Sequence, residues 1–326
     1  MRTRDWREVR NRVGSAPNMK ARLKHRVEYA ALRGFSFLFG LLPARAAYAA
    51  GGGIATVLRL ALSGRIEIAE QRIRDVLGPE PEDREIRRIA HAAWQNLVFN
   101  VIDLMRSPRL DLYRLSRMVD TLPAQPFIDR AEKRQGGIIA VGHYGNWDLA
   151  GIGLSLLGVP IFSMMRRQRN PLIDAYLNRI RTQFGMGVVE RNSRALAGII
   201  RRLKKGEVLA ILPDLRAKDP DTALRVRFLG KEAWIAGGMA LFARHANVPI
   251  YPAFAIRTGW NRHVWHVGEP VVPDPALSKE EDILRMTQAV LDQLSRAVLE
   301  HPEHYFWFNK RWVLEPYPPP ESPPAT

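Results

Sequence analysis

His143 and Asp148 are the two residues of this sequence whose types and spacing point most directly to chemistry. An imidazole with one nitrogen held by a carboxylate has a fixed tautomer, so its other nitrogen can accept a proton from a hydroxyl group. The two residues stand five positions apart in Gly-His-Tyr-Gly-Asn-Trp-Asp, residues 142–148. Such a general-base pair has no nucleophile of its own. It suits direct transfer from an activated acyl donor to an alcohol.

The residues around this pair predict a strand, a turn and a helix. Residues 137–142 form a short apolar run of the buried-strand type, and an apolar helix begins near Trp147. His143 is then expected at the carboxyl edge of a sheet, where α/β folds tend to bind ligands. Asp148 falls in the first helical turn, from which we expect its carboxylate to reach back to the imidazole.

Strand-like and helix-like segments alternate along the rest of the chain. Apolar runs at 207–213 and 248–256 predict two further strands, and a hairpin-like strand is expected at 263–267. Helical spacing of apolar residues occurs at 64–118, 172–182, 193–204, 237–246 and 279–300. This alternation predicts an α/β fold in which helices flank the sheet. We expect the catalytic domain to cover residues 64–316, before a proline-rich disordered tail at 317–326.

The N-terminal residues, 1–63, predict a basic arm followed by apolar helices that associate with a membrane. Residues 1–27 carry nine basic side chains and two acidic ones, and two apolar stretches follow, each shorter than a bilayer span. An interfacial helix pair, a marginal single span and two ordinary buried helices all fit this pattern. The adjacent positive charge favours a membrane, because basic residues are held at the anionic cytoplasmic leaflet. A signal peptide is not expected, because the apolar stretch begins too far into the chain.

Composition limits the partners of this chain of 326 residues. The net charge of +16 favours anionic partners such as nucleic acid, phospholipid, coenzyme A or an acidic carrier protein. The absence of cysteine excludes disulfides, thiolate metal sites and cysteine nucleophiles. A second basic zone, residues 166–205, carries eleven basic and two acidic side chains, and we expect it to dock the donor.

Other functional classes have weaker support in the sequence. A nucleic-acid-binding protein fits the charge, but we find no helix-turn-helix, zinc or RNA-recognition pattern. A serine hydrolase is excluded because no Gly-x-Ser-x-Gly occurs. His263 and His266 stand three apart in a strand-like stretch, which sends their side chains to opposite faces, so a shared metal is not expected. We therefore expect no metal or cofactor.

The full stretch of residues 142–148 resembles the catalytic motif of the bacterial lipid A late acyltransferase family. This family also contains phosphatidylinositol mannoside acyltransferases and belongs to the wider lysophospholipid acyltransferases. The resemblance covers most of the chain, to about Pro316, and implies a glycerolipid-acyltransferase-like fold. It implies that His143 and Asp148 are catalytic, and that Gly145, Asn146 and Trp147 contact substrate.

Further positions match the same family. Met165-Arg166 precedes Asn170-Pro171 at the family's interval, which gives Arg166 a catalytic role in binding phosphate or the developing oxyanion, and places Asn170 at the substrate. Pro213-Asp214 matches a turn at the sheet edge, where Asp214 is expected to hold a basic residue or the acceptor, or to be a simple turn residue. Residues 302–312 resemble the family's C-terminal signature, in which Lys310 and Arg311 offer phosphate contacts.

The resemblance implies acyl transfer from acyl carrier protein or acyl-CoA to a glycolipid hydroxyl at the inner membrane, with the catalytic domain facing the cytoplasm. Four residues depart from the family pattern: Leu215 and Arg216 after the aspartate, Arg227 in place of a proline, and Asn309 in place of a histidine. These departures leave the acceptor open. A lipid A precursor, another glycolipid, an aminolipid and a lysophospholipid all remain candidates.

Overall fold

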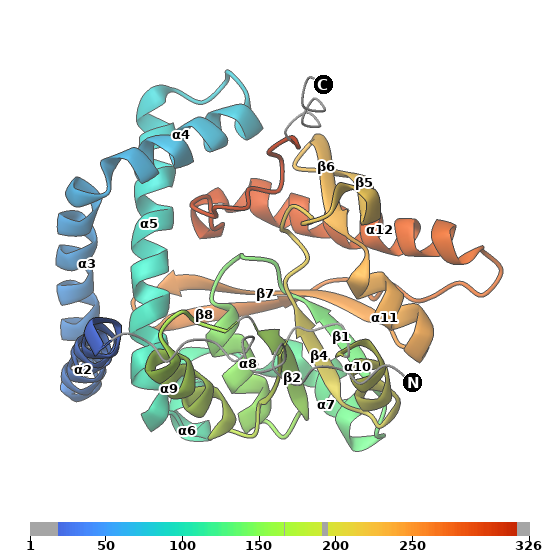
Figure 1. The fold of residues 1–326 in the computed structure, drawn as a ribbon, viewed down its shortest axis with the longest axis horizontal. Coiled ribbons are helices and arrows are strands. Elements are labelled where there is room, and N and C mark those ends of the chain that lie inside the picture. Colours follow the sequence, from blue (N-terminus) through green and yellow to red (C-terminus); the bar gives the residue numbers. More distant parts are fainter. Residues whose placement is uncertain (1–18, 166, 191–194, 318–326) are drawn as a thin grey trace, which may run out of the picture.

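The structure is a computed structural model, which describes residues 19–165, 167–190 and 195–317 (Figure 1). Within these residues the centre is a six-stranded sheet of order β3–β2–β4–β1–β7–β8. The strands from β3 to β7 in this order are parallel, and β8 is antiparallel to β7. Their bounds are β1 Gly137–Ala140, β2 Ile161–Met165, β3 Gly187–Glu190, β4 Val208–Ile211, β7 Ile250–Gly259 and β8 Arg262–Val267.

Helices cover both faces of this sheet. The described helices are α2 Met19–Leu41, α3 Ala44–Ala61, α4 Ser63–Leu77, α5 Asp83–Arg106, α6 Leu112–Met118, α7 Gln125–Glu132, α8 Trp147–Leu156, α9 Pro171–Thr182, α10 Ala195–Lys204, α11 Gly238–Ala246 and α12 Lys279–Glu300. Short 3-10 turns lie at η1 Ser107–Arg109, η2 Leu122–Ala124, η3 Pro220–Thr222 and η4 Pro302–His304. An antiparallel hairpin, β5 Ala223–Phe228 and β6 Lys231–Ala236, packs on α12.

Alternate residues of β1 and of the position after it belong to two separate hydrophobic clusters. Ile138 and Ala140 pack with the apolar faces of α10, α11 and α12, whereas Ile139 and Val141 pack with α6, α7 and α8. Successive side chains of a strand point to opposite faces of the sheet, so each apolar run of consecutive residues supplies both layers. The predicted sheet with flanking helices is therefore confirmed.

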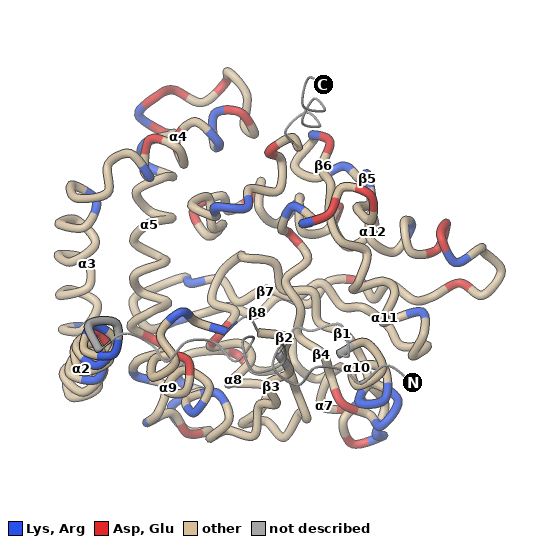
Figure 2. The backbone as a smooth tube through the Cα atoms, viewed as in Figure 1, with Lys and Arg blue, Asp and Glu red and all other residues tan. Residues whose placement is uncertain are grey.

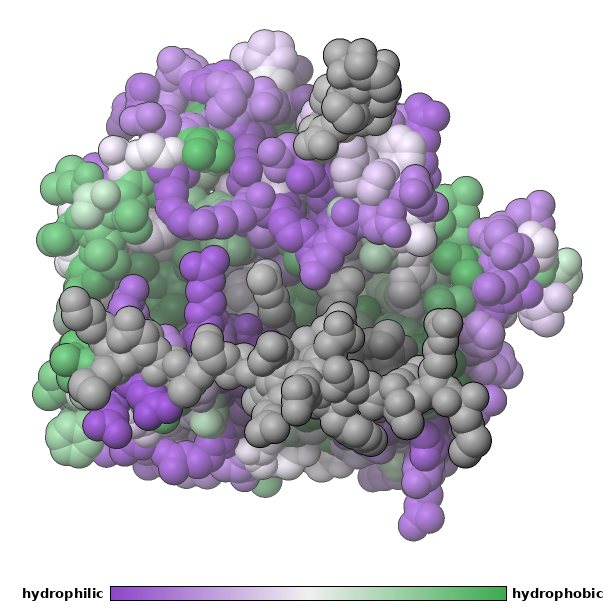
Figure 3. Space-filling model, in the orientation of Figure 1, coloured by the Kyte–Doolittle hydropathy of each residue, from purple (hydrophilic) through white to green (hydrophobic). Residues whose placement is uncertain are grey.

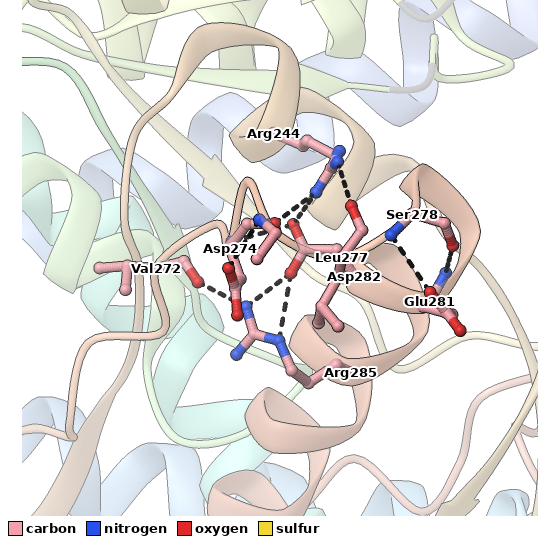
Figure 4. A network of polar contacts seen from close by, with 9 residues as sticks. Arg244, Val272, Asp274, Leu277, Ser278, Glu281, Asp282 and Arg285 are labelled. Atoms are coloured by element: carbon pink, nitrogen blue, oxygen red, sulfur yellow. Dashed lines mark hydrogen bonds and ion pairs between the residues drawn. The ribbon is translucent and has the colours of Figure 1, made fainter.

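Polar contacts hold the start of α12 against α11. Figure 4 shows Asp282, fully buried, accepting hydrogen bonds from Arg244 of α11 and from Arg285. Ser278 and Glu281 form a capping box at the first turn of α12. Leu294 of α12 lies against Gly142, and the Ala297 carbonyl accepts from the Tyr144 hydroxyl at 2.7 Å, so the position of this helix also limits the space beside His143.

The N-terminal helices α2, α3 and α4 pack along the long helix α5. Within the described residues, no individual helix is long and apolar enough to cross a bilayer. The pair α3 and α4 passes that test only when taken together, and the two helices are bent at 93° to each other. Tyr48 and Ala55 of α3 are buried, while Val57 and Leu60 on the same helix are exposed.

Candidate active site

The sheet brings His143 and Asp214 together. Strands β1 and β4 are parallel neighbours in which Ala140 is paired with Ile211. His143 lies three residues after Ala140, and Asp214 lies three residues after Ile211. The two residues therefore leave the same edge of the sheet at the same level.

Asp214 holds both the backbone and the ring of His143. Its Oδ2 accepts from the His143 amide at 2.7 Å, and its Oδ1 lies 2.9 Å from Nδ1. The Asp214 side chain is completely buried, whereas that of His143 is 18% exposed. A carboxylate at Nδ1 keeps the proton on that nitrogen, so Nε2 is left as the acceptor.

The electrostatics of this pair favour an ionised carboxylate. Burial raises the pKa of Asp214, but the nearby His143 ring and the hydrogen bonds from His143 outweigh it and bring the pKa below its usual value. Burial, together with the negative charge of the Asp214 carboxylate, raises the pKa of Tyr305 well above its usual value. Tyr305 therefore stays protonated and remains a hydrogen-bond donor.

Asp148 does not hold the imidazole, which corrects the predicted pairing. Its Oδ1 accepts from Nε of Arg181 on α9 at 2.8 Å, and both side chains are largely buried. In the described part of the chain its carboxylate makes no hydrogen bond to His143. The physical reason is that the β4 strand end already supplies a carboxylate to Nδ1, while α9 presents a guanidinium to the first turn of α8.

The conformation of the loop of residues 141–147 is fixed by two glycines and by hydrogen bonds from its backbone amides to other segments. Gly142 and Gly145 have φ of 64° and 67°, a region that favours glycine. The Gly145 amide donates to the His304 carbonyl at 2.9 Å, and the Asn146 amide donates to the Ala255 carbonyl at 2.8 Å. These two amides are therefore engaged within the fold.

Asn146 serves the fold with its side chain as well. It is 2% exposed, its oxygen accepts from the Leu149 amide at the start of α8, and its Nδ2 donates to Asp103 at 2.7 Å. Trp147, predicted beside substrate, lies with its ring 5.6 Å from that of His143 and borders an apolar cavity of about 40 Å³ against the sheet. Among residues 141–147, His143 and Trp147 are the two whose side chains are partly exposed.

Residues 304–313, here called the C-terminal segment, close the site. The Phe306 amide donates to the His143 carbonyl at 2.9 Å, and its ring lies 6.1 Å from the imidazole. Arg72 of α4 donates to the carbonyls of Trp307 and Asn309 at 2.6 and 2.9 Å. The aromatic ring of Phe306 in this segment therefore forms part of the wall of the site.

The other predicted site residues either make no contact with the imidazole or lie outside the residues that the structure describes. Asn170 is 5% exposed, caps α9, and donates to Glu28 and to the His25 carbonyl of α2. Lys310 is exposed, and Arg311 donates to the Arg216 carbonyl. Position 166 lies outside the described residues, so the role predicted for Arg166 stays a prediction.

A buried polar cluster behind the 141–147 loop was not predicted from the sequence. The Asp103 carboxylate on α5 accepts from Tyr48 of α3, from Asn146 and from Arg257 of β7. His263 of β8 lies 3.6 Å from the same carboxylate, and desolvation lowers its pKa to about 4. The sequence did carry one sign of this cluster. Asp103 stands at a position of α5 where the helical spacing predicts a buried apolar residue.

His263 and His266 do point to opposite faces of the sheet, as predicted. His263 is 3% exposed and His266 is exposed. No group of three or more potential metal ligands occurs among the described residues.

Comparison with known proteins decides the family. The model of the bacterial lipid A biosynthesis acyltransferase family matches residues 17–313. The chain belongs to this family. As a lipid A biosynthesis acyltransferase family member, it is an enzyme that transfers acyl groups, and the resemblance stated from the 142–148 motif is confirmed.

The individual relatives of this chain have low sequence identity to it. A lipid A biosynthesis acyltransferase of Haemophilus influenzae is 27% identical over 173 residues, which cover 52% of this chain and 51% of that protein. The chain thus spans about half the length of that relative. The lipid A biosynthesis lauroyltransferase of Escherichia coli is 22% identical over 87% of this chain and 90% of its own. A phosphatidylinositol mannoside acyltransferase of Mycolicibacterium smegmatis is 20% identical over 65% and 68%.

Proposed function

We propose that the chain transfers a fatty acyl group from acyl carrier protein or acyl-CoA to a glycolipid hydroxyl, with His143 as general base and Asp214 as its orienting carboxylate. The observation that carries this proposal is the pair of contacts from Asp214 to the His143 amide and Nδ1. They fix the imidazole while its Nε2 has no hydrogen-bond partner among the described residues. A general base needs this combination of fixed geometry and a free nitrogen.

The proposed reaction uses one histidine for both proton transfers. Nε2 of His143 removes the proton of the acceptor hydroxyl as its oxygen attacks the thioester carbonyl carbon. The tetrahedral intermediate then collapses, the carbon–sulfur bond breaks, and the proton passes from Nε2 to the leaving thiolate. Asp214 stabilises the imidazolium between these steps, since it lies on Nδ1 and stays ionised.

Oxyanion stabilisation is assigned to residues other than the engaged loop amides. The amides of Gly145 and Asn146 already donate to carbonyls of the fold. We therefore keep Arg166 as the proposed cation for the oxyanion or a substrate phosphate. Its guanidinium is permanently charged and multidentate. We propose that Asp148 positions α8 through Arg181 and does not act directly on the imidazole.

The substrates are proposed from the surroundings of the ring and from the relatives. Trp147 and Phe306 give the imidazole an apolar border that suits an acyl chain. The exposed cations Arg167, Arg169, Arg201, Lys204 and Lys205 offer a surface for the acidic donor. A lipid A precursor-like glycolipid is the proposed acceptor, since two relatives carry lipid A biosynthesis in their names. We place the chain at the inner membrane, with its catalytic domain facing the cytoplasm.

The test compares His143→Ala, Asp214→Asn and Asp148→Asn with purified donors and acceptors. We expect His143→Ala to abolish transfer. Asp214→Asn should lower kcat by about a thousandfold or more with little change in KM, because the ring loses its tautomer control. Asp148→Asn should lower activity less than Asp214→Asn. Appreciable acyl transfer by a folded His143→Ala variant would refute the mechanism. If Asp148→Asn lowered acyl transfer more than Asp214→Asn does, Asp148 would be the residue that orients the imidazole.

A lysophospholipid acceptor is the second candidate, because Leu215, Arg216 and Asn309 depart from the family pattern close to the site. Asn309 lies in the C-terminal segment, and Arg216 donates to the carbonyl of Pro316 at 2.7 Å. Presenting both acceptor classes to the same enzyme, with each donor in turn, separates these alternatives by the acylated product that accumulates.

A further inference from the structure

Four arginines from α2, α5, η1 and α9 line one cavity of about 490 Å³. They are Arg33 of α2, Arg106 at the end of α5, Arg109 of η1 and Arg179 of α9. Figure 2 shows basic residues gathered where these elements meet, beside α2 and α9. The described lining residues of this cavity include no carboxylate.

The charges of these arginines are not neutralised by acidic neighbours. Arg106 donates to the carbonyls of Phe39 and Leu42 at 2.5 and 2.6 Å, and Arg109 donates to that of Gly40. Arg33 and Arg179 both lie against the ring of Tyr176, at 5.1 and 5.7 Å from its centre. Within the described residues none of the four forms an ion pair, so their mutual repulsion favours an anion between them.

A neighbouring cavity extends the same positive surface. It has a volume of about 290 Å³, shares Arg106 and Arg109, and adds Arg117 and also Arg114, which is paired with Asp111 at 3.0 Å. Asp103 also lines it, but that carboxylate is paired with Arg257. Guanidinium groups bind phosphate oxygens through two parallel hydrogen bonds, which makes a phosphate the anion that this group fits best.

The cavity opens beside apolar side chains that are exposed to solvent. Phe37, which lines it, is 63% exposed, and Leu38 and Leu41 on the same helix are 60% and 55% exposed. The apolar surface continues along α3 at Val57 and Leu60, and the left-hand edge of Figure 3 is hydrophobic over these two helices. A phosphate attached to acyl chains would match both the arginine-lined cavity and the exposed apolar side chains beside it.

We propose that this cavity, here called the α2 headgroup site, binds the phosphate of an anionic phospholipid while the exposed face of α2 contacts the acyl region. The combination of a basic pocket and an exposed apolar helix face is the arrangement expected of a protein lying on an anionic bilayer. The site is separate from the proposed chemistry, because none of its described lining residues contacts His143.

The test measures co-sedimentation of the full chain with vesicles of phosphatidylcholine alone or mixed with phosphatidylglycerol. The double variant Arg33→Gln/Arg179→Gln removes two charges whose side chains are exposed and hold no backbone group. The matched control Arg87→Gln/Arg296→Gln removes two exposed charges from α5 and α12, away from the cavity. Each arginine near an anionic surface contributes about fivefold in binding, so the double variant should bind mixed vesicles at least about tenfold more weakly.

We expect the control to bind mixed vesicles as the wild type does, and all three proteins to bind phosphatidylcholine alike. Equal binding of mixed vesicles by both variants would overturn the α2 headgroup site. Displacement of wild-type protein from mixed vesicles by inorganic phosphate at constant ionic strength would also overturn it, because the ligand would then be free phosphate. None of these readouts uses acyl transfer, so the outcome is independent of the proposed function.

Discussion

At the scale of single residues, the hydrogen-bond partner of the His143 ring is Asp214 and not Asp148. Asp148 is nearer in sequence, but Asp214 is nearer in space because β1 and β4 are adjacent and in register. The sequence alone could identify His143, and it could place both acids at the sheet edge. It could not reveal the strand order. The next strand along the chain, β2, pairs with β4 and not with β1.

The ion pair between Asp148 and Arg181 should matter mainly for stability. Asp148→Asn leaves the guanidinium of Arg181, which is 9% exposed, without its counter-charge. We expect the free energy of unfolding to fall by about 2–3 kcal/mol. The double variant Asp148→Asn/Arg181→Met should recover part of this loss. Urea unfolding of the three proteins measures it. A double variant less stable than the single variant would contradict the pairing.

Two buried histidines should make the fold sensitive to mild acid. Desolvation lowers the pKa of His263 to about 4 and that of His304 to about 3, below the ordinary value of 6.5. The unfolded chain therefore binds more protons than the folded chain as pH falls below about 6.5. The free energy of unfolding should then decrease steadily from about pH 6.5 towards pH 4.

Urea unfolding at a series of pH values between 7 and 4.5 checks this prediction, and His263→Asn should flatten the profile. A wild-type stability that stays constant over this range would show that the two histidines are accessible to protons in the folded state. The lowered pKa of Asp214 acts in the same direction, but only at lower pH, where that carboxylate begins to be protonated.

At the scale of elements, the loop between β1 and α8 depends on a close approach of two backbones. A Cβ on Gly145 would overlap the carbonyl of Ala255 in β7, and φ there is 67°. Gly158 also has positive φ, at 84°, but has open space around its Cα. The two positions therefore separate the effect of backbone conformation from that of steric overlap.

We expect Gly145→Ala to lower acyl transfer by at least about tenfold, because the displaced loop moves His143 away from Asp214. Gly158→Ala should cost about 1 kcal/mol of stability and leave kcat near that of the wild type. Steady-state kinetics and thermal unfolding of both variants provide the comparison. If the two variants lose activity equally, the overlap with Ala255 has no role in positioning the ring.

Helices with regular apolar spacing and strands made of continuous apolar runs were predicted well, and less regular strands were not. The helix expected at 279–300 is α12. The strands expected at 137–142 and 207–213 contain β1 and β4, and the strand expected at 248–256 overlaps β7, which continues to Gly259. Strands β2 and β3 were missed because neither is a continuous aliphatic run: Ser163 interrupts β2, and Val188 and Val189 are the only apolar side chains of β3. The hairpin β5–β6 was missed although its sequence carried a signal, because exposed Arg225 and Arg227 alternate with buried Val226 and Phe228 as in a half-buried strand.

At the scale of the whole molecule, Asp103 connects the N-terminal helices with the sheet. It joins Tyr48 of α3, Arg257 of β7 and the 141–147 loop through Asn146. Contacts of this kind, between residues 43 to 154 positions apart, cannot be predicted from local patterns. They join the N-terminal helices and the sheet edge of the proposed active site in one polar network.

Replacing Asp103 should therefore affect the entire fold. Asp103→Asn leaves Arg257, which is 6% exposed, without a counter-charge, and we expect a loss of about 3–5 kcal/mol in the free energy of unfolding. Tyr48→Phe removes one neutral donor and should cost only about 1 kcal/mol. Urea unfolding with an unchanged m-value checks both. Similar losses for the two variants would mean that the charge of Arg257 is satisfied elsewhere.

The pairing of the C-terminal segment with the 141–147 loop has a consequence for how the enzyme comes into being. Phe306 donates to the carbonyl of His143, and Tyr305 is influenced by the charge of Asp214, yet a ribosome makes both residues more than 160 positions after His143. A nascent chain that ends before them has its histidine and aspartate but lacks the wall beside them. Synthesis itself thus delays the assembly of the proposed site until nearly the whole fold can close around it.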